Sequence, residues 1–155
     1  MSAALQRLAT ATAIGAGVTG GVFFGFSTFI MPALNRLPAN QSISAMQFIN
    51  IKAVNPLFMI ALFGPVVGSV ALVASARNDT NDASQRYLLM GAALYLVGTA
   101  ITLAVNVPQN NALAKLDPSA TSSAEAWAAY ATTWTAANHA RAIASIVAAT
   151  LFSCS

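Results

Sequence analysis

The segment Leu8–Leu34, LATATAIGAGVTGGVFFGFSTFIMPAL, decides the fold because no charged residue interrupts it. A transmembrane helix needs about 20 predominantly apolar residues to cross roughly 30 Å of hydrocarbon, and this segment is longer than that. It is also too long for the hydrophobic part of a signal peptide and has no convincing cleavage site. We therefore predict a retained transmembrane helix over residues 8–34.

The composition of the whole chain points to the same environment. Only 7% of the 155 residues are charged and 57% are hydrophobic, whereas soluble domains average roughly 25% charged residues. Eleven charged side chains are too few to cover the surface of a soluble protein. We therefore expect an integral protein of the cell (inner) membrane, in contact with the lipid bilayer. The seven Lys and Arg residues are scattered singly, which argues against a nucleic-acid partner. A single Cys excludes both an internal disulfide and a Cys-based metal site.

Further apolar segments predict three more spans, at residues 53–76, 87–107 and 136–154. The third is expected to end just before Pro108. The fourth is short, because the apolar sequence from Ala142 onward would cover only about 21 Å as a helix. This span must therefore draw Asn138, His139 and Arg141 to the membrane interface. The predicted fold is all-α: the whole chain forms a single domain, an integral membrane four-helix bundle.

The fourth helix is expected to begin well outside the bilayer. Residues 122–125 have the pattern of a helix N-terminus, and an Ala-rich sequence then continues to Phe152 without Gly or Pro. At about 100° per residue, one stripe of this helix contains Trp127, Tyr130, Trp134, Asn138, Arg141 and Ser145, with His139 on an adjacent flank. Because this regular spacing implies burial, we predict a polar site roofed by aromatic residues. His139 and Arg141 are expected to approach it from two sides of the helix.

Side-chain amides gather toward one end of the predicted bundle. Asn55, Asn106 and Asn138 lie in or beside apolar segments, where an unpaired amide is costly. We therefore expect these three residues to face a shared polar cavity.

Glycines in the first span are spaced for close helix packing. Gly17, Gly21 and Gly25 follow one another at intervals of four residues. Such a stripe of small residues lets another helix approach closely in lipid. We predict that it packs inside the bundle.

The C-terminal part of the chain carries the pattern WxxYxxxWTxxNHxR, from Trp127 to Arg141. Three other segments precede it: FGFSTFIMPALNRLP (24–38), AMQFINIKAVNPLFM (45–59) and NVPQNNALA (106–114). Together, and in this order, they resemble the anthrone oxygenase-like family of small four-helix membrane proteins. The resemblance covers nearly the whole chain, although membership of such a family does not fix the substrate.

The resemblance implies oxidation of a polycyclic anthrone to an anthraquinone by O2, without a metal or flavin cofactor. Residue by residue, it makes His139 the candidate base, with Asn138 and Arg141 as further catalytic residues and Asn106, Asn110 and Trp134 around them. From the stripe, the amides and the aromatic residues at the end of the first span, we add Tyr130, Trp127, Asn55, Asn35 and Phe26 as candidates for binding a small hydrophobic aromatic substrate. The chemistry is consistent with these residue types. An imidazole titrates near neutral pH, a cation stabilises an enolate oxygen, and aromatic side chains line a flat apolar slot.

Two other functions fit the same sequence. One His, one Cys and four acidic residues are a poor set for a protein-only metal cage, but His139 could serve as an axial ligand of a haem. A non-catalytic accessory subunit, carrier or channel element would instead use the polar end as a binding surface. Small four-helix proteins often assemble, so a homo-oligomer is also compatible with the sequence.

Overall fold

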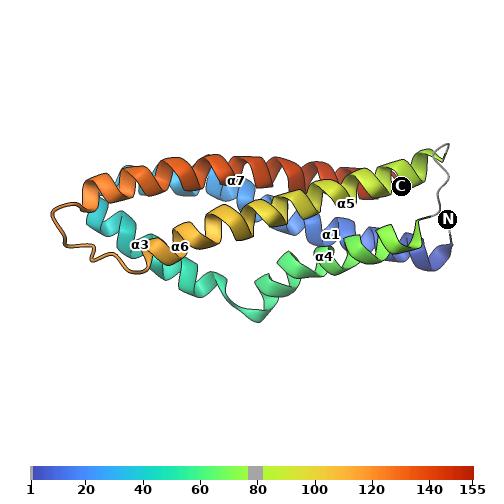
Figure 1. Cartoon of the computed structure of the whole chain (residues 1–155), viewed down its shortest axis with the longest axis horizontal. Helices are drawn as coiled ribbons and strands as arrows, with labels where there is room; N and C mark the ends of the chain where they lie inside the picture. Colours follow the sequence, from blue (N-terminus) through green and yellow to red (C-terminus); the bar gives the residue numbers. More distant parts are fainter. Residues whose placement is uncertain (1, 77–81) are drawn as a thin grey trace.

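The computed structural model describes residues 2–76 and 82–155, and all regular structure within them is helical. The α-helices are α1 (Ala3–Gly25), α2 (Met31–Leu34), α3 (Ala39–Ala53), α4 (Pro56–Ser75), α5 (Ala83–Ile101), α6 (Val107–Leu113) and α7 (Ser123–Ser153). Two π-helical segments, η1 (Phe26–Ile30) and η2 (Thr102–Asn106), join α1 to α2 and α5 to α6. Both ends of the chain lie at the same end of the molecule (Figure 1).

Three helices of the described residues are long and apolar enough to cross a membrane: Ala3–Leu34, Pro56–Ser75 and Ala83–Leu113. They indicate a membrane protein, as the composition predicts, and they contain most of the first three predicted spans. α7 packs against α1 and α5. α4 packs against the same two helices (Figure 1). The fourth predicted span, residues 136–154, lies within α7, which is not among the three.

The helix of the third predicted span does not end before Pro108. A proline lacks the N–H of a helical hydrogen bond, and its ring clashes with the preceding turn. Here η2 widens the helix just before it, and Val107 N donates to Thr102 O across five residues. The helix therefore passes Pro108 and ends at Leu113. The same arrangement recurs at η1, which is followed by Pro32.

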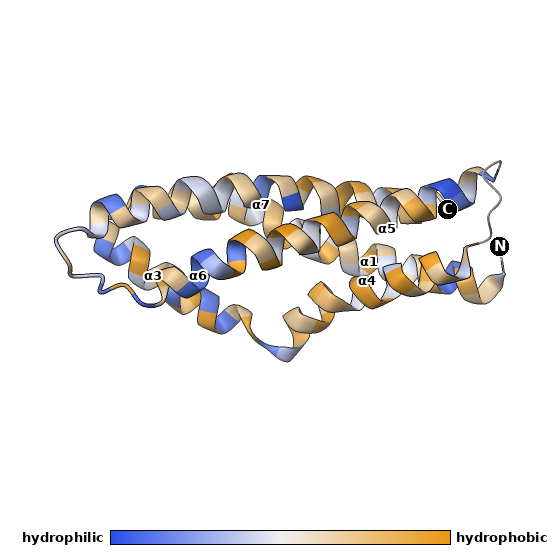
Figure 2. Ribbon diagram, in the orientation of Figure 1, coloured by the Kyte–Doolittle hydropathy of each residue, from blue (hydrophilic) through white to orange (hydrophobic). Residues whose placement is uncertain are grey.

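α7 confirms the prediction of one long helix that begins near Ser122. It runs from Ser123 to Ser153 and buries the predicted stripe: Trp127, Tyr130, Trp134, Asn138, Arg141 and Ser145. The N-terminal part of α7, together with α3 and α6, forms the more hydrophilic end of the molecule, whereas α4 and the middle of α5 are mostly apolar (Figure 2). The stripe therefore runs along α7 from the hydrophilic end of the molecule into its apolar part.

The close helix contacts of α1 involve other glycines than those predicted. Gly17 and Gly21 are exposed. A Cβ added at Gly17 would make only an ordinary contact, 3.8 Å from Ala149 Cβ on α7, and one at Gly21 would meet no atom within 4 Å. By contrast, a Cβ at Gly15 would lie 2.6 Å from Pro65 Cγ on α4, and one at Gly20 would lie 2.9 Å from Ile146 Cγ1 on α7. Gly15 and Gly20 are five residues apart and face different helices, so the tight contacts do not follow the predicted spacing of four; Gly25 is buried, but a Cβ there would meet Phe29 of the adjoining η1 segment.

Gly15→Ala is expected to destabilise the protein by about 1–3 kcal/mol, because the rigid ring of Pro65 cannot move aside cheaply. The matched control is Gly21→Ala, where the new methyl group meets open space and helix propensity favours Ala by up to about 1 kcal/mol. Thermal unfolding of both variants in detergent micelles measures the difference. Equal melting temperatures would contradict the close approach of α1 to α4.

α3 and α4 meet at a sharp bend at Val54 and Asn55, which we call the elbow (Figure 1). The Asn55 side chain caps α4: its Oδ1 accepts a hydrogen bond from Phe58 N at 3.0 Å. Its Nδ2 donates to Lys52 O at the end of α3 at 2.9 Å. One amide therefore fixes both arms of the elbow, and the elbow faces the cavity described next.

Candidate functional site

A cavity of about 470 Å³ lies between the elbow and the helices α1, α5 and α7. Its lining is mostly apolar and includes a few polar side chains. The lining residues are Val22, Phe23, Phe26, Ile49, Asn50, Lys52, Ala53, Val54, Asn55, Phe58, Met59, Leu62, Thr102, Asn106, Val107, Asn110, Trp134 and Arg141. We call this space the Arg141 cavity.

Arg141 is a buried cation held by neutral groups. Its side chain is 6% exposed. Its Nε donates to Asn138 Oδ1 at 3.0 Å, and its Nη1 donates to Thr102 Oγ1 at 3.3 Å. The guanidinium carbon also lies 3.9 Å from the ring centroid of Phe23 and 5.1 Å from that of Trp134, within the range of a cation–π interaction.

No carboxylate of the described residues neutralises this charge. Asp82 caps α5, Asp117 accepts hydrogen bonds from its own turn, and Glu125 lies in the first turn of α7. A buried charge without a counter-ion is costly, so a guanidinium kept in this state beside a cavity is suited to an anionic or strongly polarised ligand group. Charged residues buried within membrane proteins usually mark functional sites.

Asn138 connects Arg141 to the π-helical segment η1. It is fully buried, and its Nδ2 donates to Phe23 O at 2.7 Å and to Ser27 Oγ at 2.8 Å. A π-helical turn displaces the usual backbone donors, and the Asn138 amide supplies one to Phe23 O. Its Oδ1 then points at Arg141, so the irregular turn and the cation are held by the same side chain.

Two further amides line the cavity from η2 and α6. Asn106 is 1% exposed and donates to Trp134 O at 3.2 Å, while its Oδ1 is buried without a hydrogen-bond partner. Asn110 Oδ1 accepts two hydrogen bonds, from Tyr130 Oη and Trp134 Nε1, both at 2.8 Å. The cavity wall therefore contains the cation of Arg141 and the residue Asn106, whose buried amide oxygen has no hydrogen-bond partner.

The aromatic residues that were predicted to form the wall of the site do not all lie at the cavity. Trp134 and Phe26 line the cavity, with ring centroids 5.4 Å apart and planes tilted by 55°. Tyr130 stacks on Trp134 at 6.3 Å and does not itself line the cavity. Trp127 lies further out and donates from Nε1 to Asn35 Oδ1 at 3.0 Å. Of the predicted wall, the structure thus places Trp134 and Phe26 at the cavity and the others behind it.

His139 faces elsewhere. It is exposed and lines a separate cleft of about 600 Å³, together with Asn35, Trp127 and Thr135. The prediction that His139 and Arg141 approach one site is therefore wrong in its geometry. The two residues lie about 200° apart on the helix, and α7 is packed against its neighbours on the Arg141 side. The chemical role assigned to His139 stays a prediction.

The other residues at the Arg141 cavity were predicted only in part. Asn55 and Asn106 line the cavity and Asn138 reaches it only through Arg141, so the three amides do not form the shared polar cavity that was predicted. Thr102 and Phe23 were not predicted, although Thr102 lies one helical turn before Asn106 and a helical projection could have found it. Asn50, Lys52 and Phe58 were missed because only the elbow brings them to the cavity.

The charged residues of the described lining are Lys52 and Arg141, both cations. Within residues 2–76 and 82–155, no three His, Cys, Asp or Glu side chains are grouped in a way that could hold a metal ion. The cavity is therefore electropositive, apolar over most of its wall, and equipped with amides.

A protein-family model described as anthrone oxygenase matches residues 52–151 of the chain. The match includes α4, α5, η2, α6 and nearly all of α7, and therefore Asn106, Asn110, Trp134, Asn138 and Arg141. The contribution of α1 and η1 to the cavity lies outside it. No curated protein and no solved structure matches the chain.

Proposed function

We propose, since the chain belongs to the anthrone oxygenase family, that it is a membrane-embedded oxygenase acting on an apolar polycyclic or phenolic aromatic of the anthrone type. O2 is the co-substrate, and no metal or organic cofactor takes part. In this proposal α7 crosses the bilayer with the three apolar helices as a four-helix bundle in the cell (inner) membrane. The observation that carries it is Arg141, a buried guanidinium that faces a largely apolar cavity and has no counter-ion among residues 2–76 and 82–155.

The reaction needs a site that stabilises an oxyanion. An anthrone has a methylene group between two aromatic rings and opposite a ketone, so loss of one proton gives a carbanion whose charge resides largely on the ketone oxygen. The carbanion transfers an electron pair to O2 in forming a C–O bond, and the resulting hydroperoxide loses water to give the quinone. In balance, one anthrone and one O2 give one anthraquinone and one water.

Arg141 supplies the matching charge. Preorganised donors directed at a developing oxyanion commonly supply the largest single contribution to such catalysis. Asn138 and Thr102 hold the guanidinium in place through Nε and Nη1, so it need not reorganise during the reaction. The unpaired Oδ1 of Asn106 is an acceptor for a hydroxyl group of the substrate.

The cavity also suits the size and polarity of the substrate. Its volume of about 470 Å³ lies within the range of roughly 300–1,000 Å³ that is usual for small-molecule sites. Phe26 and Trp134 provide aromatic wall on one side, and Phe58 and Met59 provide apolar wall from α4. An apolar aromatic and O2 both partition into lipid, so the two reactants are concentrated where the cavity lies.

The proton acceptor in this proposal is water. Lys52 and Arg141 make the cavity electropositive, which lowers the energy of the carbanion and so strengthens the bound substrate as an acid. A positioned base is then less important than the cation. This differs from the role that the resemblance gives to His139, whose side chain lines the other cleft.

Oxygen consumption by the purified protein with anthrone tests the proposal. We expect turnover above the spontaneous oxidation measured with heat-denatured protein, and we expect His139→Ala to keep that turnover within about twofold, as surface substitutions usually have small effects. Loss of turnover in a folded His139→Ala variant would restore the imidazole as the base. Binding of anthrone without any turnover would instead favour a non-catalytic binding protein.

A further inference from the structure

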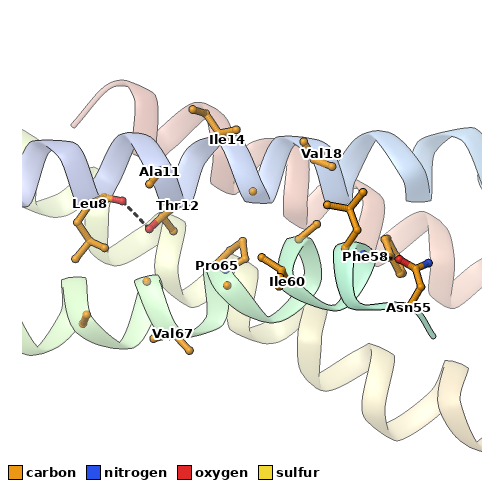
Figure 3. A pocket seen from close by; sticks show the side chains of 16 residues that line it. Leu8, Ala11, Thr12, Ile14, Val18, Asn55, Phe58, Ile60, Pro65 and Val67 are labelled. Atoms are coloured by element: carbon orange, nitrogen blue, oxygen red, sulfur yellow. Dashed lines mark hydrogen bonds between the residues drawn. The ribbon is translucent and has the colours of Figure 1, made fainter. Parts of the chain in front are cut away.

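A second, larger cavity of about 770 Å³ runs between α1 and α4 (Figure 3). Its lining consists almost entirely of apolar and small side chains. They are Leu8, Ala11, Thr12, Ile14, Gly15, Val18, Asn55, Leu57, Phe58, Ile60, Ala61, Gly64, Pro65, Val67, Gly68 and Ala71. We call this space the α1–α4 groove.

The groove is open along its side. Ile14, Ile60 and Val67 are 64%, 69% and 70% exposed, so its rim faces the hydrocarbon of a surrounding bilayer. A Cβ added at Gly64 would meet no atom within 4 Å. The contact of Gly15 with Pro65 holds the two helices together beside this open space.

The groove adjoins the Arg141 cavity at the elbow. Asn55 and Phe58 line both spaces. Figure 3 shows these two residues at one end of the groove, with Val67 and Leu8 further along it. From Phe58 to Val67, α4 extends for about 14 Å at 1.5 Å per residue. A long apolar groove therefore leads away from the cavity that contains Arg141.

We propose that the α1–α4 groove is a subsite for a hydrocarbon chain. Its ligand is an amphiphile with a polar aromatic head in the Arg141 cavity and a flexible alkyl tail that passes Phe58 and lies between α1 and α4. This proposal rests on the proposed function for the position of the head, and it adds a tail that the reaction itself does not require. A tail tethered to a bound head occupies the groove at a high effective concentration, and so displaces free lipid chains.

Photo-crosslinking tests the subsite without depending on turnover. The probe is para-decylphenol with a diazirine at the end of the alkyl chain, added to the full-length protein in lipid nanodiscs. Peptide mapping is expected to find the label on residues 60–68 of α4 and 11–18 of α1. Excess unlabelled para-decylphenol should displace it, whereas decane, which has no head, should not.

Matched variants make the test sharper. Gly64→Leu fills the groove and should reduce the label there at least tenfold. Gly21→Leu adds the same side chain at another exposed helical glycine with open space, outside the groove, and should leave the label unchanged. A label scattered over the lipid-facing surface, equal displacement by decane, or unchanged labelling of Gly64→Leu would overturn the proposal. Failure of oxygen consumption with specific labelling would reject the oxygenase activity and keep the subsite.

Discussion

Replacing Arg141 by Met is expected to reduce the turnover of anthrone by roughly 100- to 1,000-fold, the usual effect of removing an oxyanion-stabilising donor. Met has a similar length and is apolar, so it fills the space beside Phe23 and Trp134 but carries no charge. The enolate oxygen then forms in an apolar cavity without a cation. Initial rates of oxygen consumption, compared with thermal unfolding of the same preparation, measure the effect separately from any loss of folded protein.

Arg141→Lys is the intermediate variant. It keeps a positive charge but loses the planar guanidinium that stacks on Phe23 and donates to both Asn138 and Thr102. Because Lys is a point charge on a flexible stem, we expect its turnover to fall between that of the Met variant and that of the natural protein. Turnover in a folded Arg141→Met variant equal to that of the natural protein would reject the proposed role of the cation.

Asn138→Ala is expected to cost roughly 2–5 kcal/mol of unfolding free energy, the largest loss of stability among single amides of this chain. The substitution removes one of the two donors to Phe23 O, which keeps its bond from Phe26 N, and it removes the donor to Ser27 Oγ and the acceptor of Arg141 Nε. Each buried polar group left unpaired costs about 1–3 kcal/mol, and an uncompensated buried charge costs more. Denaturant unfolding in micelles, followed by tryptophan fluorescence, gives the difference.

Asn111→Ala provides the control. Asn111 is exposed on α6, two residues before that helix ends at Leu113, and exposed substitutions usually change stability by less than about 0.5 kcal/mol. A loss at Asn138 no greater than that at Asn111 would show that the buried network does not hold α7 against η1.

The α7 stripe could be predicted from the sequence because the angle between two residues of a helix does not depend on its neighbours. For that reason Trp127, Tyr130, Trp134, Asn138 and Arg141 were correctly expected on one buried face. The projection gives no information on which flank is packed. It therefore placed His139 beside the stripe but could not tell that this flank is exposed.

The cavity could be predicted only in part, because its walls depend on irregular backbone. The π-helical segments η1 and η2 have no pattern that a hydropathy reading detects, and they carry the helices past Pro32 and Pro108. The elbow likewise brings Asn50 and Phe58 next to residues far away in sequence. Apolar length correctly predicted the three helices that are long and apolar enough to cross a membrane, since it depends only on composition, whereas the site depends on where regular helices are interrupted.

The segment η2 also sets the rotational phase of everything that follows it. A π-helical turn holds one residue more than an α-helical turn, so the residues beyond η2 are rotated by about 100° relative to an uninterrupted α-helix. Asn110 meets Tyr130 and Trp134 only with this rotation. Deleting one residue from η2 would turn Asn110 away from both partners while leaving every side chain of the cavity in the sequence. The site is thus specified by the number of residues in a segment as well as by their identity, and homologues of unequal helix length would differ in it even where all the polar residues are shared.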